Sequence, residues 1–399
     1  MNVLIAAEFL DNIQDPSTYN SRFLTVADLL SDRGHRVSFV TSNFIHSSKQ
    51  HADGITKFMG HDMVTLPEPG YKKNISLKRF QSHYVLAKNL KKWFRTIEKP
   101  DVIYCAVPSL DFAYEAAKYA NENGVKFVLD IQDLWPEAFE MVMNIPVVSH
   151  LAFSGFRRTA DYIYRTADRV VAVSRTYVDR ALKVNRKCRE GHAVYLGTDV
   201  ERFDSFRSEP SPLDKPADEI WLGYVGTLGY SYDLKTVIDA LALLRDEPDC
   251  RKLKFVVAGD GPLRQEFEDH AAQKQINVCF TGRLPYPQMV ALLCQCDIAV
   301  NPIKKRAAQS IINKHGDYAA AGIPVVNSQE ATEYRALVEE RNMGVNCRCQ
   351  DPEDMAEKLL ELVRSPRLRQ TMGQNARTCA QELFHRGHTY QMIVDAVEK

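Results

Sequence analysis

Runs of apolar, largely β-branched residues between residues 221 and 347 constrain the fold most, because each run stops at a small or ionisable residue before a helix-like segment. Strands that are apolar almost throughout belong to sheets covered on both faces, as parallel sheets flanked by helices are. We therefore predict a doubly wound α/β domain, and such domains bind ligands at the carboxyl ends of their strands. The five runs begin at Trp221, Phe255, Val278, Ile298 and Ile323.

The first half of the chain repeats this alternation of strands and helices. A helix is expected over residues 21–33, where apolar residues recur at helical spacing before the stop at Gly34. Both halves are therefore expected to be parallel α/β domains. The strands expected in the first half are residues 3–7, 37–41, 102–106, 127–131 and 170–174.

A polar stretch rich in proline separates the two halves. Residues 200–219 contain three prolines among Ser, Asp and Glu, a composition typical of exposed linkers. With 399 residues, the chain has room for two domains of ordinary size. We predict an N-terminal domain over residues 1–200 and a C-terminal domain over residues 201–385, with the last helix, within residues 386–399, crossing back to the first domain.

Composition argues against several classes of function. Lysines and arginines number 51, as do aspartates and glutamates, so the formal net charge is zero and no general nucleic-acid binding is expected. The nine cysteines include no Cys-x-x-Cys pair, which argues against a zinc site and against a disulfide framework. The chain starts on a strand rather than a signal peptide and has no apolar run of about 18 residues, so we expect a cytoplasmic protein, free or on the cytosolic face of the membrane.

Three glycine-containing loops follow strands in the second half. Glycine lets the backbone approach a phosphate closely, and a helix N-terminus offers unpaired N–H groups with positive partial charge. We expect the three loops to cluster at one edge of the sheet and to bind an anion there, the alternative for the loop 226–229 being an ordinary tight turn between a strand and a helix. Their candidate residues are Gly226, Thr227 and Gly229, then Gly259, Asp260 and Gly261, and finally Gly282 and Arg283.

The segment from Asn313 to Asp317 supplies the sharpest polar signal. Lys314 and Asp317 are three residues apart, so they share one face of the first turn of a predicted helix. There the lysine is placed to neutralise a diphosphate, and the carboxylate to accept hydrogen bonds from ribose hydroxyls. The alternative is an exposed ion pair, worth less than about 1 kcal/mol.

Taken in order, these segments resemble the retaining glycosyltransferases of family 4, which have the GT-B fold of two facing Rossmann-like domains. The resemblance covers nearly the whole chain and extends to residues 165–174, 196–203 and 297–302. Residues 130–137 look like the Asp-Leu-Trp-Pro-Glu signature of a branch that builds bacterial surface polysaccharides. The function implied is transfer of a sugar, with retention of anomeric configuration, from a nucleotide sugar to a glycan or a lipid-diphosphate-linked acceptor.

By this resemblance, the second domain binds the nucleotide-sugar donor. The diphosphate is expected at the loop 226–229 and the base against Gly282 and Arg283. The ribose is expected on Asp317, and Asn313 is a further donor-binding residue. Uridine diphosphate is the default nucleotide, because it is the most frequent one in the family.

Several residues differ from the family pattern, and these differences make one lysine the main catalytic candidate. Gln309 and Asp317 stand where the family has two glutamates, and Thr227 stands where it often has an arginine. Lys314 therefore becomes the main catalytic candidate, since it can stabilise the negative charge that develops on the leaving diphosphate. The departing phosphate is expected to help take the acceptor proton, and neither a divalent cation nor another cofactor is expected.

Asp133 is the catalytic candidate of the first domain. It follows the predicted strand at 127–131, where it would face the cleft and orient an acceptor hydroxyl or the donor sugar. The alternative is that Asp130 or Asp133 caps the turn before Trp135 and Pro136. Trp135 is expected to be a packed aromatic residue rather than a platform for a sugar.

A basic stretch over residues 71–99 holds nine Lys and Arg residues and a single acidic one, Glu98. Within it, residues 85–95 predict a basic helix with an apolar face, as helices that lie on membranes have. We hypothesise that the stretch docks the protein on an anionic membrane beside a lipid-linked acceptor, the alternative being a solvated face above an ordinary core stripe. The candidate docking residues are Lys72, Lys73, Lys78, Arg79, Lys91, Lys92 and Arg95.

Two other functions remain open on these observations. A GT-B sugar-nucleotide epimerase would convert its substrate without an acceptor and would use carboxylates to move a proton. A non-enzymatic sugar-nucleotide sensor would bind its ligand and never turn it over. A nicotinamide dehydrogenase is disfavoured, because the first strand ends without the Gly-x-Gly-x-x-Gly pattern.

Overall fold

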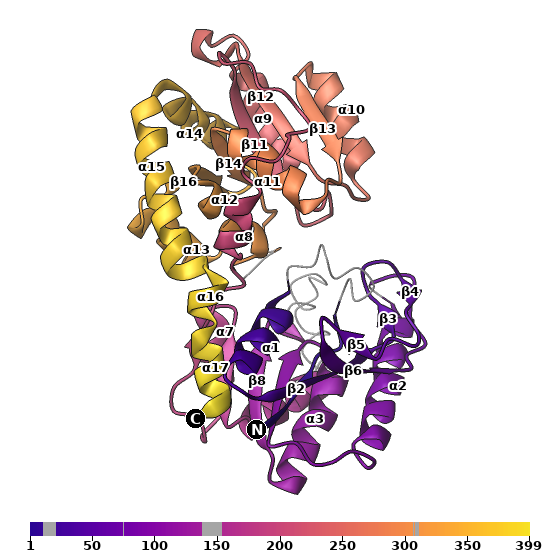
Figure 1. The fold of residues 1–399 in the computed structure, drawn as a ribbon. Coiled ribbons are helices and arrows are strands. Elements are labelled where there is room, and N and C mark those ends of the chain that lie inside the picture. The colour runs from indigo at the N-terminus through magenta and orange to yellow at the C-terminus, as the bar shows by residue number, and fades with distance from the viewer. Residues whose placement is uncertain (11–20, 75, 138–153, 306, 308–310) are drawn as a thin grey trace. The chain divides into compact units, whose positions relative to one another are not determined.

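Two compact α/β units make up the chain, and each is built on a parallel sheet, which confirms the predicted fold class (Figure 1). The computed structural model describes residues 1–399 except 11–20, 75, 138–153, 306 and 308–310. Unit 1 consists of Met1–Tyr195 together with Gly387–Lys399, and unit 2 of Leu196–Arg386.

Unit 1 contains an eight-stranded sheet in the order β10-β9-β8-β7-β1-β2-β6-β5, and every neighbouring pair is parallel except β5 and β6. The strands at its centre are almost entirely buried, as their apolar sequences predict. A short antiparallel pair, β3 (Phe44–Ile45) and β4 (Gln50–His51), lies outside this sheet. The strands of the sheet are β1 (Asn2–Ala6), β2 (Arg36–Ser42), β5 (Lys57–Phe58), β6 (His61–Leu66), β7 (Val102–Val107), β8 (Lys126–Ile131), β9 (Arg169–Ala172) and β10 (His192–Ala193).

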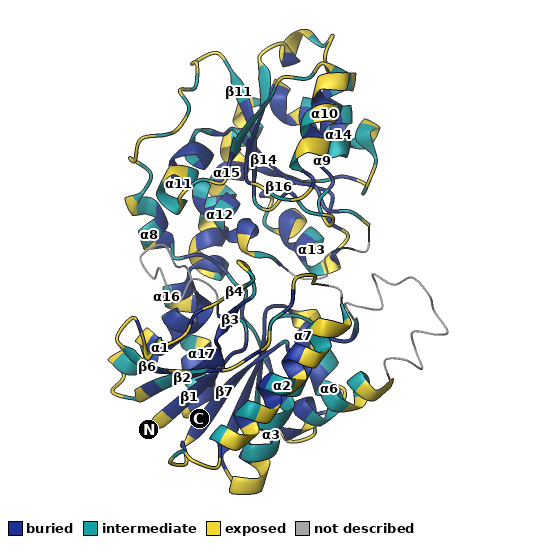
Figure 2. Ribbon diagram, turned by 90° about the vertical axis from the view of Figure 1, so that its right-hand side faces the viewer, coloured by how far each residue is buried: buried dark blue, intermediate teal, exposed yellow. Residues whose placement is uncertain are grey.

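Helices cover both faces of the unit 1 sheet. α1 and α17 lie together on one face, and α2, α3 and α6 lie side by side on the other (Figures 1 and 2). Tyr390, Ile393 and Val397 of the C-terminal segment share one buried core with residues of α1 and β1, so the last helix belongs to unit 1. The helices are α1 (Arg22–Asp32), α2 (Leu77–Trp93), α3 (Leu110–Asn123), α6 (Ser154–Thr166), α7 (Arg175–Leu182), α16 (Arg386–Thr389) and α17 (Gln391–Glu398).

A buried ion pair joins α1 to the sheet of unit 1. Arg22 donates to both carboxylate oxygens of Asp130, from Nε at 2.8 Å and from Nη2 at 2.9 Å, and neither side chain is more than 2% exposed. The Tyr104 hydroxyl adds a hydrogen bond to Asp130 Oδ2 at 2.7 Å. Arg22 also donates to the Val194 carbonyl at 2.8 Å and lies 4.9 Å from the Tyr390 ring centre. The Arg22 guanidinium thus contacts both segments at the border of unit 1: the one that ends at Tyr195 and the one that begins at Gly387.

Unit 2 contains a six-stranded, fully parallel sheet in the order β13-β12-β11-β14-β15-β16. All five predicted strands form, and β16 extends one edge. The strands are β11 (Ile220–Val225), β12 (Leu253–Ala258), β13 (Val278–Gly282), β14 (Ile298–Asn301), β15 (Val325–Asn327) and β16 (Gly344–Asn346). The helices are α8 (Val200–Ser205), α9 (Leu234–Leu243), α10 (Arg264–Lys274), α11 (Tyr286–Gln295), α12 (Asn313–Ala321), α13 (Thr332–Glu340), α14 (Pro352–Arg364) and α15 (Pro366–Cys379), with a 3-10 turn at Pro248–Cys250 and a π-turn at Ala380–Phe384.

The border between the units falls before the proline-rich stretch. Unit 2 begins at Leu196, a few residues earlier than the predicted border at residue 200. The stretch opens with helix α8, because the Asp199 side chain accepts a hydrogen bond from the Arg202 N–H and caps it, and Phe203 is buried. The predicted linker is therefore part of unit 2.

Removing the charge of Asp130 should destabilise the protein strongly. Asp130→Asn leaves the Arg22 guanidinium buried without a counter-charge, which typically costs about 3 to 5 kcal/mol. Asp179→Asn is the matched control, because Asp179 pairs with Arg175 on the surface of unit 1 and such pairs contribute below about 1 kcal/mol. Urea unfolding followed by circular dichroism measures both variants, and equal losses in the two would contradict the role of the buried pair.

Candidate functional site

The carboxyl edge of the unit 2 sheet has a switch point next to β11. From β11 the chain builds β12 and β13 on one side, and later β14, β15 and β16 on the other. Parallel sheets bind ligands in the crevice outside the strand ends at such a point. The loop that begins at Gly226 follows β11 directly, so it lies where a ligand is expected.

Two of the predicted glycine loops pack directly on each other. The Leu228 amide donates to the Asp260 carbonyl at 2.9 Å. A Cβ on Gly259 would lie 1.8 Å from the Gly226 carbonyl oxygen, and one on Gly261 would lie 2.4 Å from that of Leu228. The backbone contact itself therefore requires glycine at these two positions.

Lys314 reaches from α12 to the first of these loops. Its Nζ lies 4.1 Å from the centre of the Tyr224 ring and 4.0 Å from that of Tyr232, and a Cβ on Gly226 would be 2.9 Å from it. The side chain is buried, and Nζ has no hydrogen-bond partner among the described residues. The alternative of an exposed ion pair with Asp317 is therefore wrong.

Two opposing effects act on the charge of Lys314. Burial holds its pKa well below the ordinary lysine value, since an ammonium group loses its hydration there. The faces of the two tyrosine rings act in the opposite direction, because they attract a cation. A negative ligand beside Gly226 would favour the ammonium further. Lys314 would therefore hold its positive charge more readily beside an anion than it does alone.

Asp317, three residues further along α12, faces a different neighbour. The Tyr286 hydroxyl donates to Asp317 Oδ1 at 3.0 Å and lies 3.0 Å from Thr198 Oγ1. Burial raises the pKa of Asp317 to about 6, although hydrogen bonds from Thr198 and Tyr286 lower it. Lys314 and Asp317 thus share a helix turn as predicted, but each side chain has its own partners.

His315 is not among the residues that the sequence pattern singles out. Its ring stacks on that of Tyr334, with 3.6 Å between centres, and its Nδ1 accepts a hydrogen bond from the Ile312 N–H at 3.2 Å. Burial holds the pKa of His315 well below its ordinary value, so the imidazole is neutral. The sequence did offer a sign of its importance, because His315 directly follows Lys314 in the first turn of the predicted helix. Its role here is to anchor the start of α12.

The remaining donor-site candidates of unit 2 differ in their exposure. Gly229 is half-buried in the first loop, and Gly282 takes a φ of +77° at the end of β13. Gln309 lies outside the described residues. The exposed candidates, which a ligand can reach, are Thr227, Asp260, Arg283 and Asn313.

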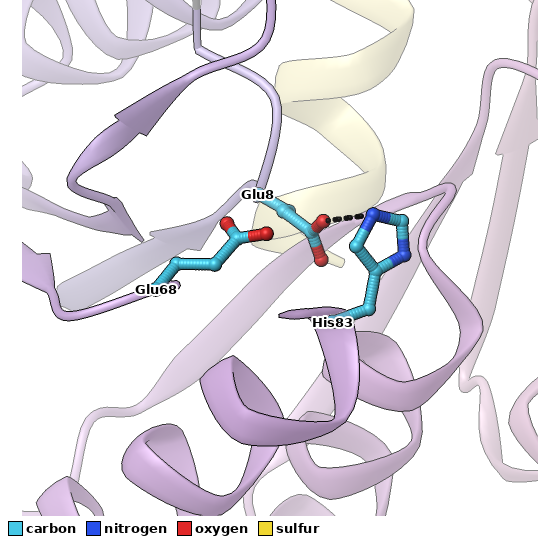
Figure 3. Close-up of side chains that lie close together, drawn as sticks. All are labelled: Glu8, Glu68 and His83. Carbon is cyan, nitrogen blue, oxygen red and sulfur yellow. Dashed lines mark ion pairs between the residues drawn. The ribbon is translucent and has the colours of Figure 1, made fainter. Parts of the chain in front are cut away.

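A second polar group lies at the carboxyl edge of the unit 1 sheet. Glu8 follows β1, Glu68 follows β6, and His83 lies on α2 (Figure 3). Each is at most 5% exposed, and Glu8 Oε1 lies 3.1 Å from His83 Nε2. The chain builds strands on both sides of β1, so this edge is the switch point of unit 1. The sequence analysis did not predict these three residues as a site. Glu8 could have indicated it, because it is a charged residue just after an apolar strand.

Serine hydroxyls and burial set the state of this group. Ser109 donates to Glu8, and Ser42 and Ser82 donate to Glu68 at 2.5 and 2.6 Å. Burial holds the pKa of Glu8 well above its ordinary value, and the charge of Glu68 adds to that effect.

The imidazole of this group is also held in its neutral form. Burial lowers the pKa of His83 to about 3, and the positive charge of Arg79 adds to the effect. His83 therefore carries no charge at physiological pH.

Arg79, one of the predicted docking residues, is half-buried, and its side chain contacts aromatic rings and His83. Its guanidinium lies 4.6 Å from the Trp135 ring centre and 5.4 Å from that of Tyr71, and its Nε donates to His83 Nε2 at 3.4 Å. Trp135 is 6% exposed and stacks on the His83 ring, which confirms that it is a packed aromatic residue. The aromatic contacts and His83 together hold the half-buried Arg79 beside this group.

Asp133 holds its own turn. Its Oδ1 accepts a hydrogen bond from the Leu134 N–H at 2.9 Å, and its Oδ2 accepts one from Trp135 Nε1 at 3.3 Å. Burial raises the pKa of Asp133. The turn-holding alternative is thus realised by Asp133, whereas Asp130 pairs with Arg22. The catalytic role of Asp133 stays a prediction.

The other basic candidates of the 71–99 stretch lie on the surface of unit 1. Leu77 and Tyr84 of α2 are 87% and 53% exposed, so large apolar groups lie among the charges. Within the described parts of the chain, no helix is both long and apolar enough to cross a membrane. The exposed basic residues are Lys72, Lys73, Lys78, Lys91, Lys92 and Arg95.

Known proteins share this architecture. Residues 20–202 match the family model described as Glycosyltransferase Family 4, and residues 205–378 match that of Glycosyl transferases group 1. The two parallel-sheet units have the fold of GT-B glycosyltransferase structures, and each half of the chain matches a glycosyltransferase family model. Its N-terminal half corresponds to the family 4 model and its C-terminal half to the group 1 model.

Individual relatives are distant. The chain is 24% identical over 251 residues to the probable glycosyltransferase WbjE of Pseudomonas aeruginosa, and 26% identical over 260 residues to the putative colanic acid biosynthesis glycosyl transferase WcaI of Escherichia coli (strain K12). These alignments span 60% of this chain and 60% of the length of each relative. The structure of Anabaena HepE in complex with UDP is similar with a TM-score of 0.71 and 16% identity, and all of both chains is covered.

Asp317 should make stability depend on pH. The pKa of Asp317 in the folded protein is about 6, above the ordinary value of 3.8. Its protonated form therefore stabilises the folded protein fully below pH 3.8, and this stabilisation is lost as the pH rises through 6. Asp317→Asn cannot ionise, and it should gain stability relative to wild type from pH 4 to pH 7 by on the order of 1 to 2 kcal/mol. Unfolding of both proteins across that range measures the difference. A difference that stays constant would mean an ordinary pKa for Asp317.

Proposed function

We propose that the protein transfers a sugar from a nucleoside diphosphate sugar to a glycan or lipid-diphosphate-linked acceptor in the synthesis of a cell-surface polysaccharide. The observation that carries the proposal is Lys314, a buried amine without a hydrogen-bond partner among the described residues, next to Gly226 at the switch point of unit 2. A diphosphate at this edge would supply the negative charge that Lys314 lacks. The similarity to WcaI, a putative colanic acid biosynthesis glycosyl transferase, supports this kind of pathway.

The proposed reaction retains the anomeric configuration. The acceptor oxygen bonds to C1 of the donor sugar on the face from which the diphosphate leaves. The C1–O bond breaks, its electron pair leaves with the diphosphate, and a departing phosphate oxygen takes the acceptor proton. Lys314 and the amides of the loop 226–229 stabilise the charge that develops, an effect typically worth several kcal/mol. This scheme includes neither a nucleophilic carboxylate nor a divalent cation.

Further residues have assigned roles in this proposal. Asp317, held by Tyr286, binds the ribose hydroxyls in its ionised form. Arg283 is exposed after β13 and binds on the side of the base, for which uridine is our first choice. UDP is the ligand present in the HepE structure, which supports testing uridine nucleotides first. Asp133 is the candidate for orienting the acceptor, and the protein acts in the cytoplasm.

A sugar-nucleotide epimerase is the second candidate. The buried carboxyl groups of Glu8 and Glu68 favour it, since epimerisation needs groups that move a proton. The two functions differ in what happens to the donor when no acceptor is present. Incubation of the protein with UDP-sugars alone, followed by proton NMR, separates them: conversion to an epimer supports the epimerase, and an unchanged sugar supports the transferase.

Lys314→Met should weaken the binding of nucleoside diphosphates, because it keeps the length of the side chain and removes its charge. We expect the Kd to rise at least about tenfold, which corresponds to about 1.4 kcal/mol. Thermal shift against UDP, GDP and ADP gives the measurement, since a ligand that binds the folded state raises the Tm. Lys235→Met is the control, because Lys235 is exposed and pairs with Glu266 at 2.5 Å.

The outcomes of this test are distinct. If no diphosphate stabilises the wild-type protein, the donor site itself is refuted. If one does and Lys314→Met responds equally, the site stands and the role of Lys314 falls. Loss of turnover in Lys314→Met with an unchanged Kd would restrict the lysine to the leaving-group step.

We also propose that the exposed basic face of α2 docks on anionic lipid. Reversal of two charges, Lys91→Glu with Lys92→Glu, should lower binding to phosphatidylglycerol vesicles by well over tenfold, since each basic residue near the surface contributes about 1 kcal/mol. Arg348→Glu with Arg364→Glu is the control, because both arginines are exposed in unit 2. Co-sedimentation at low salt gives the comparison. Equal binding of the wild type to anionic and neutral vesicles would count against docking.

A further inference from the structure

Glu8, Glu68 and His83 bring three potential metal ligands together at the carboxyl edge of the unit 1 sheet (Figure 3). One ligand atom from each residue lies within 4.8 Å of the other two, and all three side chains are buried. Glu8 Oε1 and His83 Nε2 are 3.1 Å apart, close to the separation of neighbouring ligands that share one ion at bond lengths of about 2.0 to 2.2 Å. We propose that these three residues bind one divalent transition-metal ion.

An unpartnered oxygen is the independent observation that points to a ligand. Glu8 Oε1 is buried and has no hydrogen-bond partner among the described residues, although it faces His83 Nε2. Arg79 Nε directs its hydrogen at that same nitrogen, so Nε2 presents a lone pair rather than a proton. Glu8 Oε1 thus faces a nitrogen that can only accept, and an ion bound between the two residues would replace the Arg79 hydrogen bond at Nε2 and give Oε1 the partner that it lacks.

Serine hydroxyls hold the two carboxylates in the orientation that a metal site needs. Ser109 donates to Glu8 Oε2, which leaves Oε1 available for an ion. Ser42 and Ser82 each donate to one oxygen of Glu68, and each of these oxygens keeps a second lone pair. Hydrogen bonds of this kind to the ligands are the usual outer support of metal sites.

The ligand set selects the kind of ion. One imidazole nitrogen with two carboxylate oxygens suits Zn²⁺ or Mn²⁺, whereas Mg²⁺ prefers oxygen ligands and retained water. An ion here neutralises both carboxylates and joins the ends of β1 and β6 to α2. The positive charge of Arg79 opposes binding, so we expect an affinity low enough for a chelator to remove the ion. All three ligands belong to unit 1, so the proposal does not depend on the donor site.

The metal content and thermal stability of the full-length chain test this proposal. The protein is stripped with EDTA, dialysed, and then titrated with ZnCl₂, MnCl₂ or MgCl₂. Bound metal is counted by mass spectrometry, and Tm is followed by fluorescence. We expect about one equivalent of Zn²⁺ or Mn²⁺ and a Tm that rises with the concentration of the ion, as binding to the folded state requires. Mg²⁺ at the same concentration should produce neither effect.

Ligand-removing variants locate the ion. Glu8→Gln and His83→Asn should each abolish both the bound equivalent and the rise in Tm. His61→Gln is the matched control, because His61 pairs with Asp28 elsewhere in unit 1 and should leave both effects unchanged. If the ligand variants do not fold, the visible absorption of the Co²⁺-loaded wild-type protein still shows whether the ion has nitrogen and oxygen ligands.

Two results would overturn the proposal. One is the absence of bound Zn²⁺ and Mn²⁺ in the wild-type protein after titration. The other is metal binding that persists in both Glu8→Gln and His83→Asn, because the ion would then lie elsewhere. If the wild-type protein binds no metal and Glu8→Gln is more stable than the wild type, the place between Glu8 and His83 belongs to a proton instead.

Discussion

The ion pair between Arg22 and Asp130 organises unit 1 from inside its core. Two ions removed from water lose several kcal/mol of hydration each, and only close geometry recovers that loss. Here two parallel hydrogen bonds and the Tyr104 hydroxyl provide it. Because Arg22 also holds the Val194 carbonyl and lies over Tyr390, the same charge determines where α1, the outgoing chain and the returning chain meet. An apolar pair would bury equally well without fixing these positions.

Loss of hydration also shapes both polar sites. It lowers the pKa of Lys314 and of His83, and it raises the pKa of Glu8 and of Asp317. Each group is thereby held away from the charged form that water favours, so the folded chain gains little from it alone. Proteins place such groups mainly at functional sites, where a ligand restores the balance. An anion would do so beside Lys314, and a cation between the two carboxylates of unit 1.

Parts of the proposed donor site could be predicted from the sequence because they depend on local patterns. Gly226 after an apolar strand and Lys314 in the first turn of a helix follow from periodicity within short windows. The shared turn of Lys314 and Asp317 is likewise a property of the helix. The residues that they contact do not follow from the helix, since Tyr224 belongs to β11 and Tyr286 to α11. Packing alone decided that two residues on one helix turn contact different tyrosines rather than each other.

The sequence by itself determined the order of strands and helices, the α/β class and the edge of unit 2 at which a ligand is expected, because apolar β-branched runs and helical spacing are local signals. Only the tertiary structure decided which charged groups are buried and what they face. Glu8, Glu68 and His83 are far apart along the chain and meet because β1 and β6 end at one edge of the sheet, where His83 of α2 packs against them. From the sequence, Arg79 is predicted to be one more exposed cation. In the structure it is half-buried, and its guanidinium lies beside the rings of Trp135 and Tyr71. Burial and partnership depend on contacts across the whole unit, which no short window of residues contains.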